Sequence, residues 1–159
     1  MVVNNKKIRK GMITNMKIST KGRYALRMMV DLAINKGEKP VSIKEIAERQ
    51  HISDKYLEQI ISVLNKAGYV KSVRGPQGGY MLLRAPKDYT VGMILRLIEG
   101  SLAPVECLEF EENTCPRRQE CVTLKVWEKI DQAVKDVVDN ITLEDLVQWS
   151  TDMSDHYSI

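Results

Sequence analysis

The residues of this chain best suited to chemistry are its three cysteines, Cys107, Cys115 and Cys121. Their spacing is Cys-x7-Cys-x5-Cys, in a segment that reads as a loop between two helices. Clustered thiolates bind soft metals or iron–sulfur clusters, and exposed thiolates are also open to oxidation. Three cysteines are one short of the usual four ligands, so a carboxylate, solvent or another chain would have to complete a cluster. Spacing alone does not distinguish such a metal or cluster site from three free thiols on a flexible loop.

Other patterns exclude several classes of protein. Residues 1–15 are polar and basic and lack the apolar core of a signal peptide, and no apolar run approaches the ~20 residues of a membrane helix. We therefore expect a cytoplasmic protein without membrane contact, where disulfides are not the expected use of cysteines. The chain has no Cys-x-x-Cys pair and no acid–base constellation, so we expect that it is not an enzyme.

The segment from 42 to 83 has the pattern of a winged helix-turn-helix. Ser42 and Glu45 form a capping-box pattern before a short apolar-periodic stretch that ends near Gln50. A second helix begins after Ser53, a good N-cap residue, and ends before Gly68, which suits a left-handed C-terminal cap. The short connection between the two helices is typical of a helix-turn-helix. The second helix has an apolar stripe of Tyr56, Leu57, Ile60, Ile61 and Leu64.

A glycine-rich hairpin follows the two helices. Residues 69–73 alternate as a half-buried strand does, and residues 80–83 form the return strand. The connecting sequence Arg74-Gly75-Pro76-Gln77-Gly78-Gly79 allows unusual backbone angles and a close approach to a surface. It is not a phosphate-binding loop, because no Gly-Lys-Ser/Thr follows and no helix begins there. Next to the helix pair, we interpret this hairpin as a wing.

Charge divides the chain into two halves. Residues 1–89 carry 18 Lys and Arg against 7 Asp and Glu, a net charge of +11, whereas residues 90–159 have a net charge of −8. A basic half of this size predicts contact with the phosphates of double-stranded DNA. The acidic half is expected to stay away from DNA.

The remaining pattern predicts a mainly α fold with a small β-hairpin wing, a winged helix-turn-helix joined to a long dimerisation helix. Further helices are expected at 20–36, from 91 to a stop at Gly100, at 124–138, and as a short last helix after Thr142. The helix at 124–138 has a wide apolar face and little chain left to cover it, which indicates a homodimer. We divide the chain into a disordered basic tail (1–15), a winged helix-turn-helix domain (16–89), and a dimerisation region (90–159) with a cysteine-containing sensor loop at about 101–123.

Three motifs together are similar to the Rrf-two family of bacterial transcription regulators. They are Met16-Lys-Ile-Ser-Thr-Lys-Gly-Arg-Tyr-Ala-Leu, Tyr56-Leu-Glu-Gln-Ile and Val73-Arg-Gly-Pro-Gln-Gly-Gly-Tyr, and the resemblance covers roughly residues 16–150. It implies that the second helix of the motif enters the major groove and that the wing reaches the minor groove. Glu58 would then accept a hydrogen bond from cytosine, and Arg74 would suit a narrow minor groove. The expected DNA-binding residues are Lys55, Tyr56, Glu58, Gln59, Arg74, Gly75 and Gln77, with core packing as the alternative role of Tyr56.

Branches of this family differ at the cysteine loop. The cysteines resemble the iron–sulfur loop of the IscR type, but Leu124 stands where that type has a histidine, and Arg23 stands where the NsrR type has an aspartate ligand. The sequences Ser101-Leu-Ala-Pro-Val-Glu and Thr142-Leu-Glu-Asp-Leu resemble the CymR type, which lacks the cluster and responds through cysteine synthase. The resemblance thus leaves two alternatives open. The protein either binds an iron–sulfur cluster, for which 2Fe-2S is expected rather than 4Fe-4S, or it binds no cofactor.

The function that these observations predict is a repressor. A homodimer would bind a partly palindromic operator and control genes of cysteine, sulfur or iron–sulfur metabolism, with cysteine synthase as a further partner. The first alternative is an iron–sulfur sensor of the IscR or NsrR type that responds to iron, oxygen or nitric oxide. A winged helix that only binds proteins, as an adaptor, is a remote alternative that the basic half and Arg74 disfavour.

Overall fold

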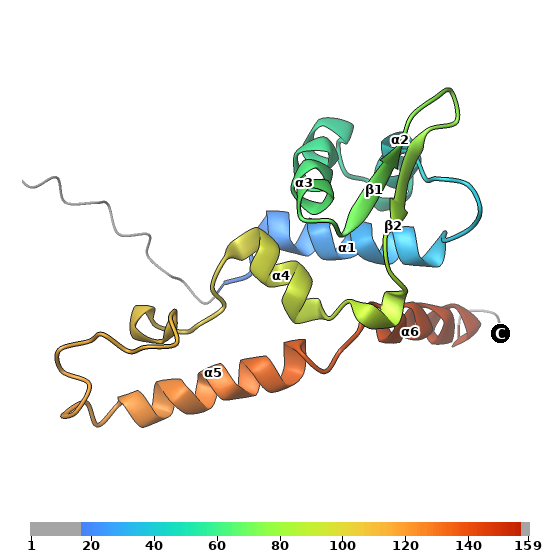
Figure 1. The fold of residues 1–159 in the computed structure, drawn as a ribbon. Coiled ribbons are helices and arrows are strands. Elements are labelled where there is room, and N and C mark those ends of the chain that lie inside the picture. Colours follow the sequence, from blue (N-terminus) through green and yellow to red (C-terminus); the bar gives the residue numbers. More distant parts are fainter. Residues whose placement is uncertain (1–16, 157–159) are drawn as a thin grey trace, which may run out of the picture.

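The computed structural model describes residues 17–156, and within them the chain is mainly helical with one small antiparallel sheet (Figure 1). This confirms the expected fold class. The elements are α1 (Thr20–Ile34), α2 (Ile43–Gln50), α3 (Asp54–Lys66), β1 (Val70–Val73), β2 (Gly79–Leu82), the 3-10 turn η1 (Pro86–Asp88), α4 (Val91–Glu99), the 3-10 turn η2 (Glu106–Leu108), α5 (Leu124–Val138) and α6 (Leu143–His156).

Helix ends follow the local signals in the sequence. At the start of α2, the backbone N–H of Glu45 donates to Ser42 Oγ (3.2 Å) and the N–H of Ser42 donates to Glu45 Oε2 (2.8 Å). These reciprocal bonds confirm the capping box. The N–H and the hydroxyl of Ser42, which both donate to the Glu45 carboxylate, lower the pKa of Glu45. Ser53 accepts the N–H of Tyr56 at the start of α3, and Gly68 has φ +70 just after its end. The turn between α2 and α3 passes through His51, at φ 53.

The wing is a two-stranded sheet with one isolated bridge beside it. β1 and β2 pair with a register from Val70↔Leu82 to Val73↔Gly79. Val41 adds a bridge on the other side of β2, where its N–H donates to Tyr80 O (3.0 Å) and its carbonyl accepts from Tyr80 N–H (2.8 Å). A Cβ added to Gly79 would collide with the Val41 carbonyl, so only glycine permits this close approach. The hairpin is thereby attached to the residue that precedes the cap of α2.

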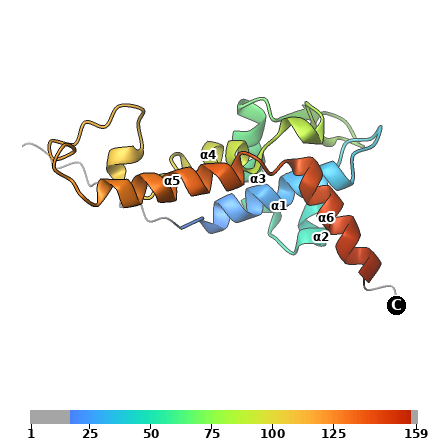
Figure 2. The ribbon, with the colours of Figure 1, turned by 90° about the horizontal axis from the view of Figure 1, so that it is seen from below.

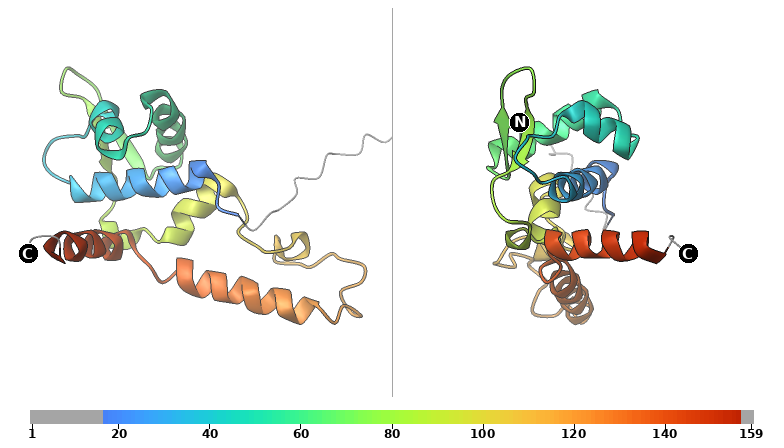
Figure 3. Two further views of the ribbon diagram at one scale, coloured as in Figure 1. Left: turned by 180° about the vertical axis from the view of Figure 1, so that it is seen from behind. Right: turned by 90° about the vertical axis from the view of Figure 1, so that its right-hand side faces the viewer.

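α1 is the centre of the fold. α2, α3 and the hairpin lie on one side of α1, and α4 and α6 lie on the other (Figures 1 and 3). Met28 and Met29 on α1 are fully buried in the core. Ile94 of α4 and Leu143 of α6 belong to the same core as the helix-turn-helix residues. The boundary between a domain at 16–89 and a dimerisation region at 90–159 therefore remains a prediction about roles, because packing is continuous across it.

α5 lies apart from this core, alongside α4 and η2 (Figure 2). It spans Leu124–Val138, as the periodicity predicts. Its apolar residues stay partly open to solvent, and Val126 and Val137 are 50% and 56% exposed. No helix in the described part of the chain is long and apolar enough to cross a bilayer.

The sequence-based expectations were wrong at two helix ends. α6 is 14 residues long rather than short, and it is capped at its start by Thr142, whose hydroxyl accepts the N–H of Asp145 (3.1 Å). It continues beyond its docked first turns, where Gln148 donates to Asp152 Oδ1 one turn later (2.8 Å). α1 ends at Ile34 rather than Lys36. The predicted basic tail at 1–15 lies outside the described residues.

Candidate nucleic-acid interface and cysteine loop

One face of α3 is exposed and polar. Leu57 and Ile60 are fully buried on the inner face, whereas Lys55, Glu58 and Gln59 are exposed. α3 lies next to the hairpin on the side of α1 opposite α4 and α6 (Figure 1). The helical period therefore separates a packing face from a face free for contact with DNA. Ser62 and Lys66 extend this exposed face, and helical spacing from Lys55 and Gln59 would have identified them in the sequence.

Tyr56 has a packing role in this structure. It is half-buried, and its ring meets that of Tyr24 edge-on at 5.6 Å between centroids and 81° between planes. Arg27 lies over the other ring of the pair, 5.5 Å from the Tyr24 centroid. The alternative considered for Tyr56, core packing, is thus present, and a contact with DNA remains a prediction.

The tip of the wing presents an unpaired cation. Arg74 is exposed and makes no hydrogen bond or ion pair with any other described residue. Gly75 has φ +124, a conformation that disfavours side chains, and its carbonyl accepts the N–H of Gly78 (2.9 Å). Gln77 is exposed beside them. The turn therefore holds Arg74, Gly75 and Gln77 away from the body of the protein.

Sequence reasoning missed a buried carboxylate that joins α1 to α2. Asp31 is 2% exposed and accepts hydrogen bonds from Arg49 Nη2 (2.7 Å), Arg49 Nε (3.1 Å) and Gln50 Nε2 (2.9 Å). The bond to Asp31 raises the pKa of Arg49. Arg27 donates in turn to Gln50 Oε1 (3.1 Å) and to the Gln50 carbonyl (2.5 Å). We call these four residues the Asp31 network. The sequence feature that could have predicted this network is an aspartate, Asp31, among the apolar residues on the buried face of α1.

The cysteine loop, residues 101–123, does not gather its thiols. Cys107 lies in η2, Cys115 and Cys121 follow in irregular chain, and all three are free and partly buried. Among the described residues, no group of three or more Cys, His, Asp or Glu side chains is arranged to hold a metal ion. In this arrangement the residues do not fit an iron–sulfur cluster. Leu124, in the position of the histidine ligand of the IscR type, begins α5.

Cys121 has the most distinctive surroundings of the three cysteines. Cys121 lies three residues before the start of α5, and its Sγ is 3.4 Å from Thr123 Oγ1. The hydrogen bond with Thr123 lowers the pKa of the thiol, and the backbone N–H groups of Leu124 and Thr123 and the charge of Arg117 act in the same direction. A stabilised thiolate is the reactive form of cysteine.

α4 connects the cysteine loop to α1 and to the end of α5. Glu99 Oε1, at its end, accepts both the N–H (3.0 Å) and the hydroxyl (2.7 Å) of Ser19, the residue that caps α1. One turn earlier, Arg96 makes two bonds to Asp139 after the end of α5 (2.6 and 2.9 Å). This pairing lowers the pKa of Asp139 and raises that of Arg96. A shift of α4 would therefore strain or break its bonds to the start of α1 and to the end of α5.

The helix pair, the wing and the exposed polar face of α3 define a winged helix-turn-helix transcription regulator. A model of the Rrf2 family, described as an iron-dependent transcriptional regulator, matches residues 18–149, and the chain belongs to this family. It is a DNA-binding transcription regulator rather than an enzyme.

Its relatives include two kinds of regulator. The chain is 47% identical over 142 residues to the HTH-type transcriptional regulator CymR of Bacillus subtilis, covering 89% of this chain and 97% of the relative. It is 40% identical over 132 residues to IscR of Pectobacterium carotovorum, covering 83% and 79%. Among solved structures, CymR (YrzC), the global cysteine regulator of B. subtilis, has a TM-score of 0.70 at 49% identity, covering 84% and 97%. T. potens IscR has a TM-score of 0.68 at 49% identity, covering 84% and 88%.

Proposed function

We propose that this regulator acts in the cytoplasm as a homodimeric repressor of genes for cysteine, sulfur or iron–sulfur metabolism. The observation that carries this proposal is that α3 and the β1–β2 hairpin lie on one side of α1, opposite α4 and α6, and that both carry exposed polar or basic side chains. Two such heads related by a two-fold axis match a partly palindromic operator.

The exposed apolar residues of α5 support the homodimer. Val126 and Val137 lie open to solvent on a helix with little cover from its own chain, and Trp127 and Ile130 are only partly buried. A face of this kind is stabilised when a second copy covers it, because apolar area is removed from water. The α5 helices of two chains would then form the dimer interface.

Each DNA-binding residue has a role suited to its chemistry. Glu58 would accept a hydrogen bond from a cytosine amino group in the major groove, and Gln59 would bond a neighbouring base edge or phosphate. Lys55 would contact phosphate, and Tyr56 would contribute its hydroxyl at the edge of the packed aromatic pair. At the wing, Arg74 would enter the minor groove, where the small Gly75 permits close approach and Gln77 adds a polar contact.

The proposed input is the cysteine loop, and α4 would carry its effect. Oxidation of a thiol, or docking of a partner such as cysteine synthase, would change the loop that follows Gly100. The bonds of Glu99 to Ser19 and of Arg96 to Asp139 would pass that change to α1 and α5. The 47% identity to CymR and the dispersed cysteines favour this input.

An iron–sulfur sensor is the second candidate, because the chain retains three cysteines and is 49% identical to T. potens IscR over 84% of its length. Visible absorption and iron content of protein purified without oxygen test it. Bound iron and sulfide, of the 2Fe-2S kind in the first instance, would establish the sensor. Colourless, iron-free protein that resists reconstitution and still binds operator DNA would favour the CymR-like input.

The wing is tested with Arg74→Ala, using operator duplexes that the wild-type protein selects from a random pool. We expect affinity to fall about tenfold on every selected duplex, since a minor-groove arginine is worth roughly 1–3 kcal/mol, and the salt dependence to become shallower. Lys129→Ala on α5 removes a charge away from this face and should leave affinity unchanged. Equal affinity of wild type and Arg74→Ala in fluorescence anisotropy would show that the wing does not contact DNA.

A further inference from the structure

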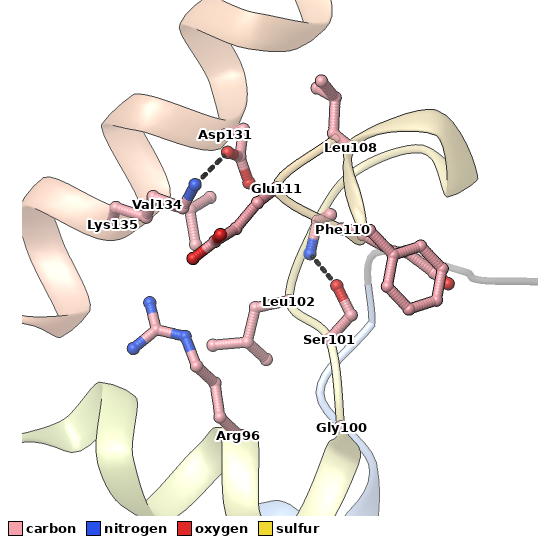
Figure 4. A pocket seen from close by; sticks show the side chains of 12 residues that line it. Arg96, Gly100, Ser101, Leu102, Leu108, Phe110, Glu111, Asp131, Val134 and Lys135 are labelled. Carbon is pink, nitrogen blue, oxygen red and sulfur yellow. Dashed lines mark hydrogen bonds and ion pairs between the residues drawn. The ribbon is translucent and has the colours of Figure 1, made fainter. Parts of the chain in front are cut away.

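A cavity of about 420 Å³ lies between the C-terminal end of α4, the first half of the cysteine loop and α5 (Figure 4). Its size is within the range of small-molecule sites. It contains none of the cysteines and none of the expected DNA-binding residues. The apolar part of its wall consists of Leu102, Ala103, Leu108, Phe110 and Val134.

Charged groups of both signs also line the cavity. Lys135 Nζ pairs with Asp131 Oδ2 (2.6 Å), and Asp131 is 9% exposed. Arg96 uses two N–H groups for Asp139, which leaves three of its five donors for another acceptor. Glu111 makes no hydrogen bond or ion pair with any other described residue, and its carboxylate points into the space between α4 and α5 (Figure 4).

We propose that this cavity binds a free α-amino acid with an aliphatic side chain. The ammonium group would pair with Glu111, and the carboxylate would accept hydrogen bonds from the remaining donors of Arg96. The side chain would lie against Leu102, Leu108 and Val134, where burial of each CH₂ is favourable.

The charges select this class over simpler ligands. An anion without an amine leaves Glu111 unpaired next to a negative ligand, which is unfavourable, and an amine without an acid leaves the spare Arg96 donors unused. A zwitterion satisfies both groups at once. Glu109 and the Asp131–Lys135 pair also line the cavity. Glu111 and the spare donors of Arg96 are the two groups of opposite sign that a small zwitterion beside the apolar wall would pair with.

Binding would hold the cysteine loop against α4 and α5, because Glu111 comes from the loop, Arg96 from α4 and Val134 from α5. Any effect of the amino acid on operator affinity rests on the proposed function and is measured separately. The binding test therefore contains no DNA, so failure of the repressor proposal and failure of this site give different results.

The test is isothermal titration calorimetry of the full chain with three probes of similar shape. L-leucine carries both charges, leucinamide lacks the carboxylate, and 4-methylpentanoate lacks the amine. We expect L-leucine to bind at least tenfold more tightly than either analogue. Equal binding of leucinamide would make the site a cation site, equal binding of 4-methylpentanoate would make it an anion site, and absence of binding by L-leucine would exclude the site; each overturns the proposal.

A matched pair of variants tests the role of Glu111. Glu111→Gln should lower the affinity for L-leucine at least tenfold. Glu112→Gln is the same change at an exposed neighbour that does not line the cavity, and its affinity should equal that of the wild type. Both side chains are exposed, so both variants are expected to fold. Equal affinity of Glu111→Gln and Glu112→Gln for L-leucine would show that the ammonium group is not recognised there.

Discussion

At the scale of single residues, the chain uses charge mainly to hold elements in place. Asp31 is buried at 2% exposure, and three N–H donors from Arg49 and Gln50 compensate for its loss of hydration. Its partners are the last two residues of α2, immediately before the turn that leads into α3. The carboxylate thus helps to set the position at which α3 begins.

Replacing Asp31 with Asn keeps the size of the side chain but removes its charge. We expect the free energy of unfolding to fall by roughly 2 kcal/mol, because Arg49 and Gln50 lose a charged acceptor while Arg49 is partly compensated by water. Urea denaturation at neutral pH measures this loss. Glu38→Gln, at an exposed carboxylate, is the control, and a loss no larger in Asp31→Asn than in that control would contradict the role of the network.

Cys121 should be the most reactive thiol of the loop. Its lowered pKa means that a larger fraction is thiolate at neutral pH, and this fraction falls as the pH drops through the lowered pKa. In alkylation with iodoacetamide at pH 7, followed by mass spectrometry, we expect Cys121 to be modified before Cys107 and Cys115. Thr123→Val removes the hydrogen bond to the thiol and should lower the alkylation rate of Cys121. If the variant leaves its rate unchanged, the hydrogen bond is not the cause.

At the scale of elements, short contacts join parts of the chain that do not follow one another directly. Val41 pairs with Tyr80 of β2 and immediately precedes the capping box of α2, so this bridge joins the wing to α2. Glu99 at the end of α4 binds Ser19 at the start of α1 in a similar way. Such contacts make the relative positions of α3 and the wing a property of several elements together.

Gly79→Ala should disturb this attachment. The added Cβ would collide with the Val41 carbonyl and with the backbone N of Ser42, so the chain must shift, at a cost of roughly 1–3 kcal/mol. Gly37→Ala is the matched control, because no atom lies within 4 Å of its added Cβ, and it should change stability by less than about 0.5 kcal/mol. Thermal and urea unfolding compare the two variants, and equal stabilities would argue against the close packing of Gly79.

At the scale of the whole molecule, the two proposed activities lie on separate surfaces. α3 and the wing are on one side of α1, whereas α5 lies beyond α4 on the other side (Figures 1 and 2). This separation matches the division of charge, +11 for residues 1–89 and −8 for residues 90–159. A second copy on α5 would leave both proposed DNA-binding faces free.

The double variant Val126→Glu with Val137→Glu should separate the proposed dimer into monomers. Val126 and Val137 are 50% and 56% exposed in the single chain, so the variant is expected to fold. Two carboxylates in an apolar interface are costly to bury, so the variant should not dimerise. Sedimentation velocity should give a dimer for the wild type and for Lys129→Glu, and a monomer for the double variant. A wild-type monomer, or an unchanged mass in the double variant, would contradict the α5 interface.

Local patterns were the reliable part of the prediction from sequence. The helix starts at Ser42 and Ser53 are confirmed, since a cap is decided by groups within three or four residues. The length of α6 was not predictable in this way, because its extent depends on docking of its first turns against α1 and η1. The roles of Glu58 and Arg74 remain predictions from family resemblance, for which the structure supplies exposure.

The sequence by itself determined the helices, the hairpin wing, the division of charge and the family of this protein, because these depend on residue types at short, regular spacing. Only the tertiary structure decided which distant groups meet. It paired Asp31 with Arg49, Glu99 with Ser19 and Val41 with Tyr80, left the three cysteines apart, and formed a cavity beside Glu111. Such contacts result from the packing of helices around α1, and no local propensity specifies them.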